Sequence, residues 1–254
     1  TIVMNLPAGP YVRVTAYDIT ATLTIPGGPV IAITGDFYFD QVVRKGSTTK
    51  ITRLALSDAS LTVDGVGIRR ATAALVFSSA GVAGIIGGEV EVAPSGFSVG
   101  ATVGVAINTT NVAVDDTITV DGRDIVIRLA ATPKITVFAE DLEINIGDFV
   151  TIHGNISFAS DGSFAGDGIT IFLGQGPYET SKGVRNPAAI GVALTNGKVG
   201  MVRFAGGKYA LHAEGDIALI GLDGLVVSGR VTIDINTSGQ AITRVLTIPS
   251  TSGP

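Results

Sequence analysis

The sequence predicts an all-β protein made of two tandem, homologous antiparallel β-domains, each a sandwich or roll, that are joined stiffly. The main observation is an internal repeat, because residues 96–110 return 128 positions later as residues 224–238, with six of the fifteen positions identical. In both copies apolar residues alternate with small or polar ones and stop at Asn-Thr. This alternation is typical of a long strand with one buried face. The composition, with 34 glycines and only 15% charged residues, also favours β-structure over helix.

A second stretch of similarity sets the limits of the two copies. Residues 2–14 match residues 125–137 at a constant offset of 123, and the identical positions include Ile2, Val3, Leu6, Pro10 and Val14. We therefore expect one domain at residues 1–123 and another at 124–254, as a whole number of repeats from a longer array. No Pro-, Gly- or Ser-rich linker separates the copies, so we expect a continuous or closely abutting sheet. The alternative is an elongated, solenoid-like continuous β-sheet.

Turn signals divide each copy into about seven strands. In the first copy we expect strands at residues 12–25, 30–40, 51–56, 60–64, 71–77, 82–92 and 97–107. Two short strands at residues 117–120 and 124–129 then close the first copy and lead directly into the second. In the second copy we expect them at residues 135–146, 149–159, 169–173, 188–194, 199–204, 209–219 and 225–235. Residues 26–29, Pro-Gly-Gly-Pro, predict a turn.

Particular residues predict irregularities in these strands. Asp18 and Asp141 lie at the centre of equivalent strands and predict a turn or a strand break. Gly35 and Gly154 lie at the centre of the next two equivalent strands, 30–40 and 149–159, and predict a bulge or bend there. Residues 174–187 form the longest polar loop, and loops on a rigid β-scaffold are where binding specificity is usually placed.

Composition excludes several classes of protein. The chain has no cysteine, so disulfides, thiolate metal sites and thiol catalysis are not available. A formal charge of −5 and a pI near 5.0 make nucleic acid and anionic membranes poor partners. No run of apolar residues is long enough for a membrane-spanning helix. The two histidines, His153 and His212, are not equivalent in the repeat, and no nucleophile elbow, HExxH or Walker A motif is present. We therefore expect no enzyme and assign no catalytic, cofactor-binding or metal-binding residue.

Calcium is the one metal for which the carboxylates offer candidates, since clustered aspartates at loop ends can bind it. None of the candidate aspartates has the alternating D-x-D-x-D-G spacing. The second copy has Thr243 and Arg244 at the positions equivalent to Asp115 and Asp116. We favour turn-forming and solubilising aspartates instead. The candidates are Asp115, Asp116, Asp121, Asp161 and Asp167.

Three asparagines, Asn108, Asn155 and Asn236, begin formal glycosylation sequons. For Asn108 and Asn236, an asparagine side chain that caps the turn at a strand end explains the recurrence more simply. The chain has no tryptophan, and its tyrosines form no visible stripe for a sugar-binding face.

Residues 197–215 read GKVGMVRFAGGKYALHAEG, and residues 221–229 read GLDGLVVSG before the Asn-Thr-Ser stop. This rhythm of glycine and apolar residues resembles the tandem β-repeats of giant bacterial secreted or surface proteins of the adhesin-like kind. The resemblance covers nearly the whole second copy, and the first copy more loosely. It implies an extracellular or cell-surface location and neighbouring repeats of the same array, and it carries no catalytic residue.

Three functional hypotheses follow from these features. The first is a structural repeat module that acts as a stiff extender or self-associates end to end through its sheet edges. The second is a module that binds calcium, a glycan or a partner protein through the loop at 174–187 or the Asp-bearing turns. The third is a lipid-carrying β-groove like that of the AsmA-like bridge proteins, which would require an open apolar trough.

Overall fold

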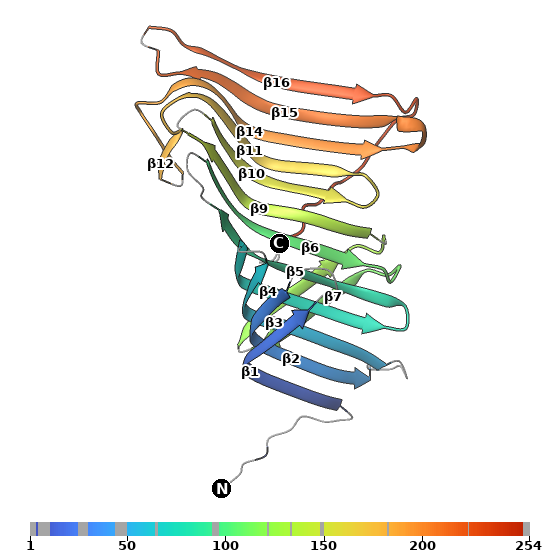
Figure 1. Cartoon of the computed structure of the whole chain (residues 1–254). Coiled ribbons are helices and arrows are strands. Elements are labelled where there is room, and N and C mark those ends of the chain that lie inside the picture. Colours follow the sequence, from blue (N-terminus) through green and yellow to red (C-terminus); the bar gives the residue numbers. More distant parts are fainter. Residues whose placement is uncertain are drawn as a thin grey trace.

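The computed structural model describes residue 4 and residues 11–24, 30–43, 50–63, 66–92, 97–120, 122–132, 134–147, 150–181, 183–222 and 224–250. The described chain is all-β, with one 3₁₀ turn, Ala205–Gly207, and no α-helix. Twelve strands form one antiparallel sheet in the order β1-β2-β3-β4-β5-β6-β9-β10-β11-β14-β15-β16 (Figure 1). The turn predicted at residues 26–29 lies outside the described residues.

The strands of the first half are β1 (Tyr11–Thr24), β2 (Val30–Val43), β3 (Lys50–Val63), β4 (Val66–Ser78), β5 (Gly81–Val92), β6 (Phe97–Asn108), β7 (Val114–Val120) and β8 (Arg123–Leu129). Those of the second half are β9 (Lys134–Ile146), β10 (Val150–Ala159), β11 (Phe164–Gln175), β12 (Glu179–Ser181), β13 (Val184–Arg185), β14 (Ile190–Arg203), β15 (Tyr209–Ile220) and β16 (Val227–Asn236). The pairs β7-β8 and β12-β13 form two small separate sheets.

The large sheet runs from the first copy into the second without interruption, because β6 pairs directly with β9. Two separate sandwiches or rolls are therefore not what the described strands form, and that expectation is wrong. The continuity agrees with the alternative interpretation, although neighbouring strands are antiparallel and do not coil as a solenoid would. β6 pairs with β5 on one side and with β9 on the other, so the first copy has no free edge at this point.

The strands are longer than the sequence predicts, because several expected breaks are bulges inside one strand. β3 covers two expected strands, 51–56 and 60–64, and β14 covers 188–194 and 199–204. The predicted irregularity at Asp18 is a bulge, where the pairing of β1 with β2 shifts between Ala16 and Ile19. The bulge predicted at Gly35 is confirmed by a register shift of β2 against β3. A residue with positive φ absorbs the extra length at each bulge, and the strand continues.

The bulges recur at equivalent places in the two halves of the sheet. The shift between Ala16 and Ile19 in β1 has its counterpart between Ala139 and Leu142 in β9, at the same offset of 123. At the bulges, four equivalent pairs of residues have positive φ: Asp18 and Asp141, Gly35 and Gly154, Asp58 and Gly168, and Arg70 and Asn196. β1 to β6 therefore repeat, in register, as β9, β10, β11, β14, β15 and β16.

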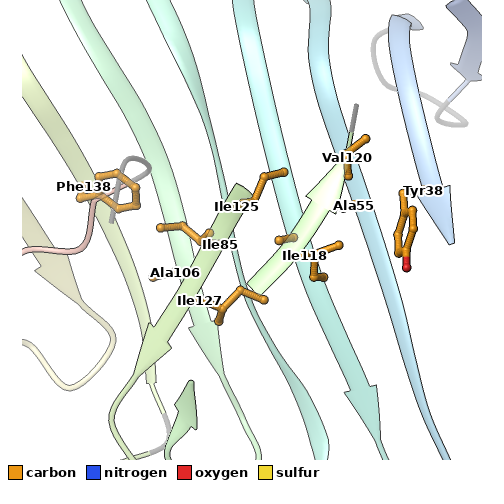
Figure 2. Packing of buried hydrophobic residues seen from close by; sticks show 10 residues of the cluster. Tyr38, Ala55, Ile85, Ala106, Ile118, Val120, Ile125, Ile127 and Phe138 are labelled. Carbon is orange, nitrogen blue, oxygen red and sulfur yellow. The ribbon is translucent and has the colours of Figure 1, made fainter. Parts of the chain in front are cut away.

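The β7-β8 hairpin covers one face of the first half of the sheet and forms the main core with it (Figure 2). Ile118, Val120, Ile125 and Ile127 of the hairpin are each 4% exposed or less. Full burial of each such side chain contributes about 2 kcal/mol. Opposite them the sheet presents three alanines, which let the hairpin approach closely, and three larger side chains. These sheet residues are Tyr38, Ala55, Ala74, Ile85, Ala106 and Phe138.

The segment after β16 is the counterpart of β7. At an offset of 128, Val114, Ile118 and Val120 correspond to Ile242, Leu246 and Ile248. Residues 240–250 have no regular secondary structure and return from the end of β16 toward the middle of the sheet (Figure 1). Ile248 packs against the core of the first half. The second half is thus covered on the same face as the first half, but by an irregular segment.

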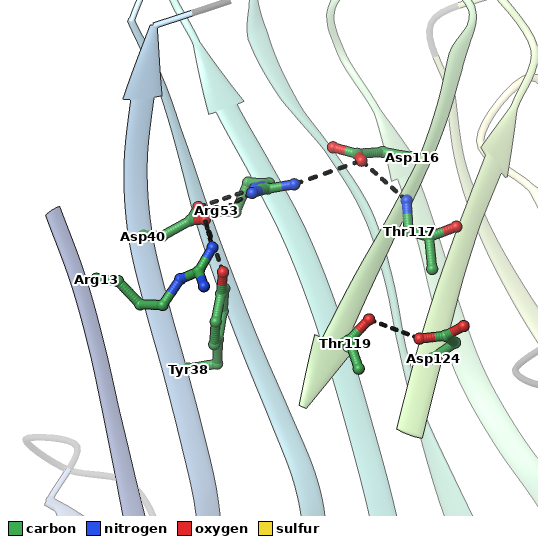
Figure 3. A network of polar contacts seen from close by, with 8 residues as sticks. All are labelled: Arg13, Tyr38, Asp40, Arg53, Asp116, Thr117, Thr119 and Asp124. Atoms are coloured by element: carbon green, nitrogen blue, oxygen red, sulfur yellow. Dashed lines mark hydrogen bonds and ion pairs between the residues drawn. The ribbon is translucent and has the colours of Figure 1, made fainter. Parts of the chain in front are cut away.

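A buried charge network also ties the hairpin to the sheet (Figure 3). Asp40 of β2 is fully buried and accepts hydrogen bonds from Arg53 Nε at 2.8 Å, Arg53 Nη2 at 2.6 Å and Tyr38 Oη at 2.7 Å. Arg53 also lies 3.7 Å from Asp116 of the hairpin, and Arg13 lies 3.8 Å from Asp40. Burial alone would raise the pKa of Asp40, but the hydrogen bonds from Arg53 and Tyr38 hold that pKa below its ordinary value.

Candidate functional site

The most unusual feature of the molecule is an apolar sheet face that no other described segment covers. One row of directly paired residues crosses all twelve strands, and every member is apolar. None of these side chains is buried, and Val137 and Phe158 are 54% and 57% exposed. The row is Ala16, Phe37, Leu56, Ala73, Ile86, Val105, Val137, Phe158, Phe164, Met201, Leu211 and Ile235. Contiguous exposed apolar surface of this kind marks interaction sites.

The face that the alternation predicts as buried is therefore the uncovered one. In β6, Val103, Val105 and Ile107 are only partly buried, whereas Ala106 and Asn108 on the opposite face are buried. The hairpin covers the face with the smaller side chains, because a second β-layer can approach small residues most closely. Alternation identified the apolar face correctly, but the prediction that this face is the buried one is wrong.

Small residues at the bulges keep the apolar face continuous along the strands. A Cβ built at Gly166 would lie 2.7 Å from Val199 Cγ1 and 3.4 Å from Ile169 Cδ1, so those two side chains already fill the space above the glycine. In the first half, Ala59 and Ala71 pair with each other at the equivalent bulge and are buried. The apolar surface thus extends to both sides of the bulges.

The sheet has two open edges in the part of the chain that the structure describes. β1 pairs only with β2, and β16 pairs only with β15. Both edge strands are long and contain no proline or lysine, the residues that commonly protect edges. Every residue of β16 is exposed. Such edges are templates for pairing with another strand.

The aspartates considered for calcium do not come together. Asp115 lies 3.5 Å from Arg128, Asp116 faces Arg53, and Asp167 lies 4.0 Å from Lys198. Asp161 accepts hydrogen bonds from the backbone and hydroxyl of Ser163, as a turn-forming aspartate does. Asp121 lies outside the described residues. Within the described ranges, no group of three or more metal-binding side chains is found.

Burial alone would raise the pKa of Asp161, but the hydrogen bonds from Ser163 keep it below its ordinary value. The carboxylate is therefore held as an acceptor inside its own turn.

The two histidines and the long loop also have structural roles. His212 Nδ1 lies 2.6 Å from Asp234 Oδ1 on the neighbouring strand, and His153 lies in β10 beside the bulge at Gly154. The loop predicted at residues 174–187 begins inside β11 and contains the β12-β13 hairpin. Tyr178 of this loop packs against Phe172, with ring centroids 5.5 Å apart. A cavity of about 450 Å³, with mostly polar lining, lies between the loop and β9 and β10.

The turn-capping role predicted for the repeated Asn-Thr stop is confirmed. Asn108 Oδ1 accepts hydrogen bonds from the backbone and hydroxyl of Thr110, and its Nδ2 donates to the carbonyl of Val112. Asn236 makes the same three contacts with Ser238 and Gln240. Each asparagine thus ends its strand and directs the chain toward the covered face. Asn155, the third sequon, instead accepts the backbone N–H of Asp141 at the bulge of β9.

A cavity of about 860 Å³ lies on the covered face between residues 242–250 and strands β11, β14, β15 and β16. In the first half, β8 contacts the equivalent strands β4, β5 and β6. By the offset of 128, a counterpart of β8 would begin at residue 251, outside the described residues. The cavity therefore lies where β8 lies in the first half.

Comparison of the chain with known protein families, with curated proteins and with solved structures finds no match. Among the described residues, no helix is long and apolar enough to cross a membrane. The site must therefore be interpreted from its own geometry, which offers an apolar face and two strand edges.

Proposed function

We propose that the chain is a structural repeat module of a long bacterial surface protein of the adhesin-like kind, in which it serves as a stiff extender and self-associates end to end. The observation that carries this proposal is the repetition of six strands, with every bulge in register, inside one continuous sheet. A repeat of this kind can add further units at either edge without changing its geometry. The broad hydrogen-bonded junction between β6 and β9 supports stiffness, because it joins the twelve strands of the two copies into one sheet.

End-to-end association is expected to give a series of oligomers that lengthens with protein concentration. Each added copy satisfies one open edge and leaves another, so no closed dimer should dominate. Sedimentation velocity over a wide concentration range measures the series. Ile233→Lys on β16 is the matched variant, since a charge on the apolar face of this edge strand would disfavour pairing with another apolar strand, while β15 stays paired with β16. A wild-type chain that remains monomeric at high concentration would contradict self-association.

A second function, the binding of lipid acyl chains along the uncovered sheet face, is favoured by the twelve-residue apolar row. That row offers a continuous apolar surface, and none of its side chains is polar and able to select a particular headgroup. Both functions are compatible in one molecule, because the row meets the sheet edges at Ala16 and Ile235.

For this second function we expect a fluorescent fatty acid to bind the wild-type chain. It should bind the double variant Val137→Glu/Phe158→Glu at least about tenfold more weakly, because unpaired carboxylates on the apolar face are costly to desolvate under a bound acyl chain. The control is Thr117→Glu, an exposed position on the hairpin. Fluorescence titration gives the dissociation constants. Equal affinities for wild type and the double variant would place any bound lipid elsewhere.

A further inference from the structure

We propose that β16 of one molecule pairs antiparallel with β1 of a second copy of this chain, in the register that β6 and β9 already have inside the molecule. This inference rests on the proposed end-to-end association and specifies its strands, orientation and register. The partner is a second copy of this chain, because the pairing of β6 with β9 inside the molecule, the internal junction, is a template for the pairing of β16 with β1 between molecules, the outer junction.

The template follows from the equivalence of the strands. β16 is the counterpart of β6 at an offset of 128, and β1 is the counterpart of β9 at an offset of 123. Inside the molecule β6 and β9 are paired over their whole length, with one shift between Gly100 and Thr102. β1 carries its bulge at Asp18, the equivalent of the bulge at Asp141 in β9. The two open edges thus have the shapes of two strands that pair elsewhere in the same sheet.

The offsets fix which residues would lie opposite one another. The internal pair Ile107 and Ile135 corresponds to Ile235 and Val12, and the internal pair Val105 and Val137 corresponds to Ile233 and Val14. Val103 and Ala139 correspond likewise to Val231 and Ala16. All of these residues lie on the uncovered apolar face, so the apolar row would continue from one copy into the next. A slip by one residue would place the apolar side chains on the wrong face.

Charges on the other face agree with this register. Asp234 would lie opposite Arg13, and their side chains are 72% and 44% exposed, so both can reach a partner. Arg230 would lie opposite Tyr17, which is 58% exposed. Opposite charges and cation-aromatic pairs across neighbouring strands are favourable, whereas like charges are not.

The outer junction also avoids a steric conflict. Inside the molecule Phe138 lies opposite Gly104, and its ring fills the space where a Cβ at that glycine would be. The corresponding outer residues are Thr15 and Thr232, which are both exposed. Two threonines fit directly opposite each other in an antiparallel pair. Because β16 meets β1 rather than itself, the contact is heterologous and would generate an open linear assembly.

The test uses cysteine pairs, which the absence of native cysteine makes unambiguous. Thr15→Cys and Thr232→Cys are made as separate single variants, mixed and oxidised, and a disulfide should join one molecule of each and double the mass. Thr20→Cys with Ser228→Cys is a second pair in register, in case either first variant fails to fold. The control is Thr15→Cys with Ser228→Cys, which is four residues out of register, too far for a disulfide.

The outcomes separate this inference from the proposed function. Cross-linking of the two in-register pairs and not of the control is the expected result. A disulfide dimer from either single variant alone would mean that β1 pairs with β1 or β16 with β16, which overturns the proposal. Oligomers in sedimentation without in-register cross-links would also overturn this register but leave end-to-end association standing. A monomer in sedimentation without cross-links would overturn both.

Discussion

Replacement of Phe138 by alanine is expected to lower the free energy of unfolding by about 3 to 5 kcal/mol. The ring is 2% exposed and lies in the core that β7, β8 and the sheet share (Figure 2). It also covers Gly104 on the neighbouring strand, where no other side chain can fill the space. The variant would therefore leave a cavity under the hairpin, because Gly104 has no side chain that could move into the space left by the ring. Urea unfolding followed by circular dichroism measures the loss.

Phe158→Ala is the matched control for this prediction. Phe158 belongs to β10, the strand next to β9, but lies on the uncovered face and is 57% exposed. Its main aromatic contact is with Phe164, at 4.6 Å between ring centroids. Because most of its surface stays in contact with solvent, its removal should cost about 1 kcal/mol. Equal losses for the two variants would mean that the hairpin does not define the buried face.

These two phenylalanines show what a strand pattern can and cannot predict. Alternation assigned the side chains of β6 correctly to two faces, because the period of a strand is two. It could not show which face is covered, since the covering layer is a hairpin whose position depends on tertiary packing. The available signal was the small size of Gly104 and Ala106, which leaves room for a second layer on their face. Large apolar residues on the other face suggested burial, and the structure leaves them open.

Local backbone features were predictable where a residue type determines them by itself. Gly35 indicated a bulge or bend, and Asn108 indicated a capped strand end because its side chain mimics a turn. Asp18 indicated a turn or strand break, and the structure has a bulge there inside a continuous strand. The missing linker predicted a continuous or closely abutting sheet at the junction, but the main prediction still placed the copies in sandwiches or rolls. Pairing between β6 and β9 depends on edges that are distant from any turn signal. The network around Asp40 was also missed. Asp40 and Arg53 become neighbours only once the register of β2 and β3 is known.

Asp40→Ala is expected to destabilise the protein by about 3 to 5 kcal/mol, the loss typical of breaking a buried ion pair from one side. The side chain of Asp40 is fully buried, and that of Arg53 is 20% exposed. Without the carboxylate, Arg53 keeps only the longer contact with Asp116, and the buried hydroxyl of Tyr38 loses its acceptor. Arg53 would then be held less firmly, which weakens the contact through which this network attaches the hairpin to the sheet (Figure 3). Thermal and urea unfolding at neutral pH measure this loss.

The pH dependence of the same variant tests the mechanism. The folded protein holds the pKa of Asp40 below the value of about 3.9 that an unfolded chain has, so the carboxylate stabilises the fold fully above that value. This stabilisation is lost as the pH falls through the lowered pKa, and the difference between wild type and Asp40→Ala should shrink in acid. Glu89→Ala, which removes an exposed ion pair with Arg70, should cost at most about 1 kcal/mol at neutral pH. If the difference for Asp40→Ala were the same in acid as at neutral pH, packing rather than the buried charge would account for its effect.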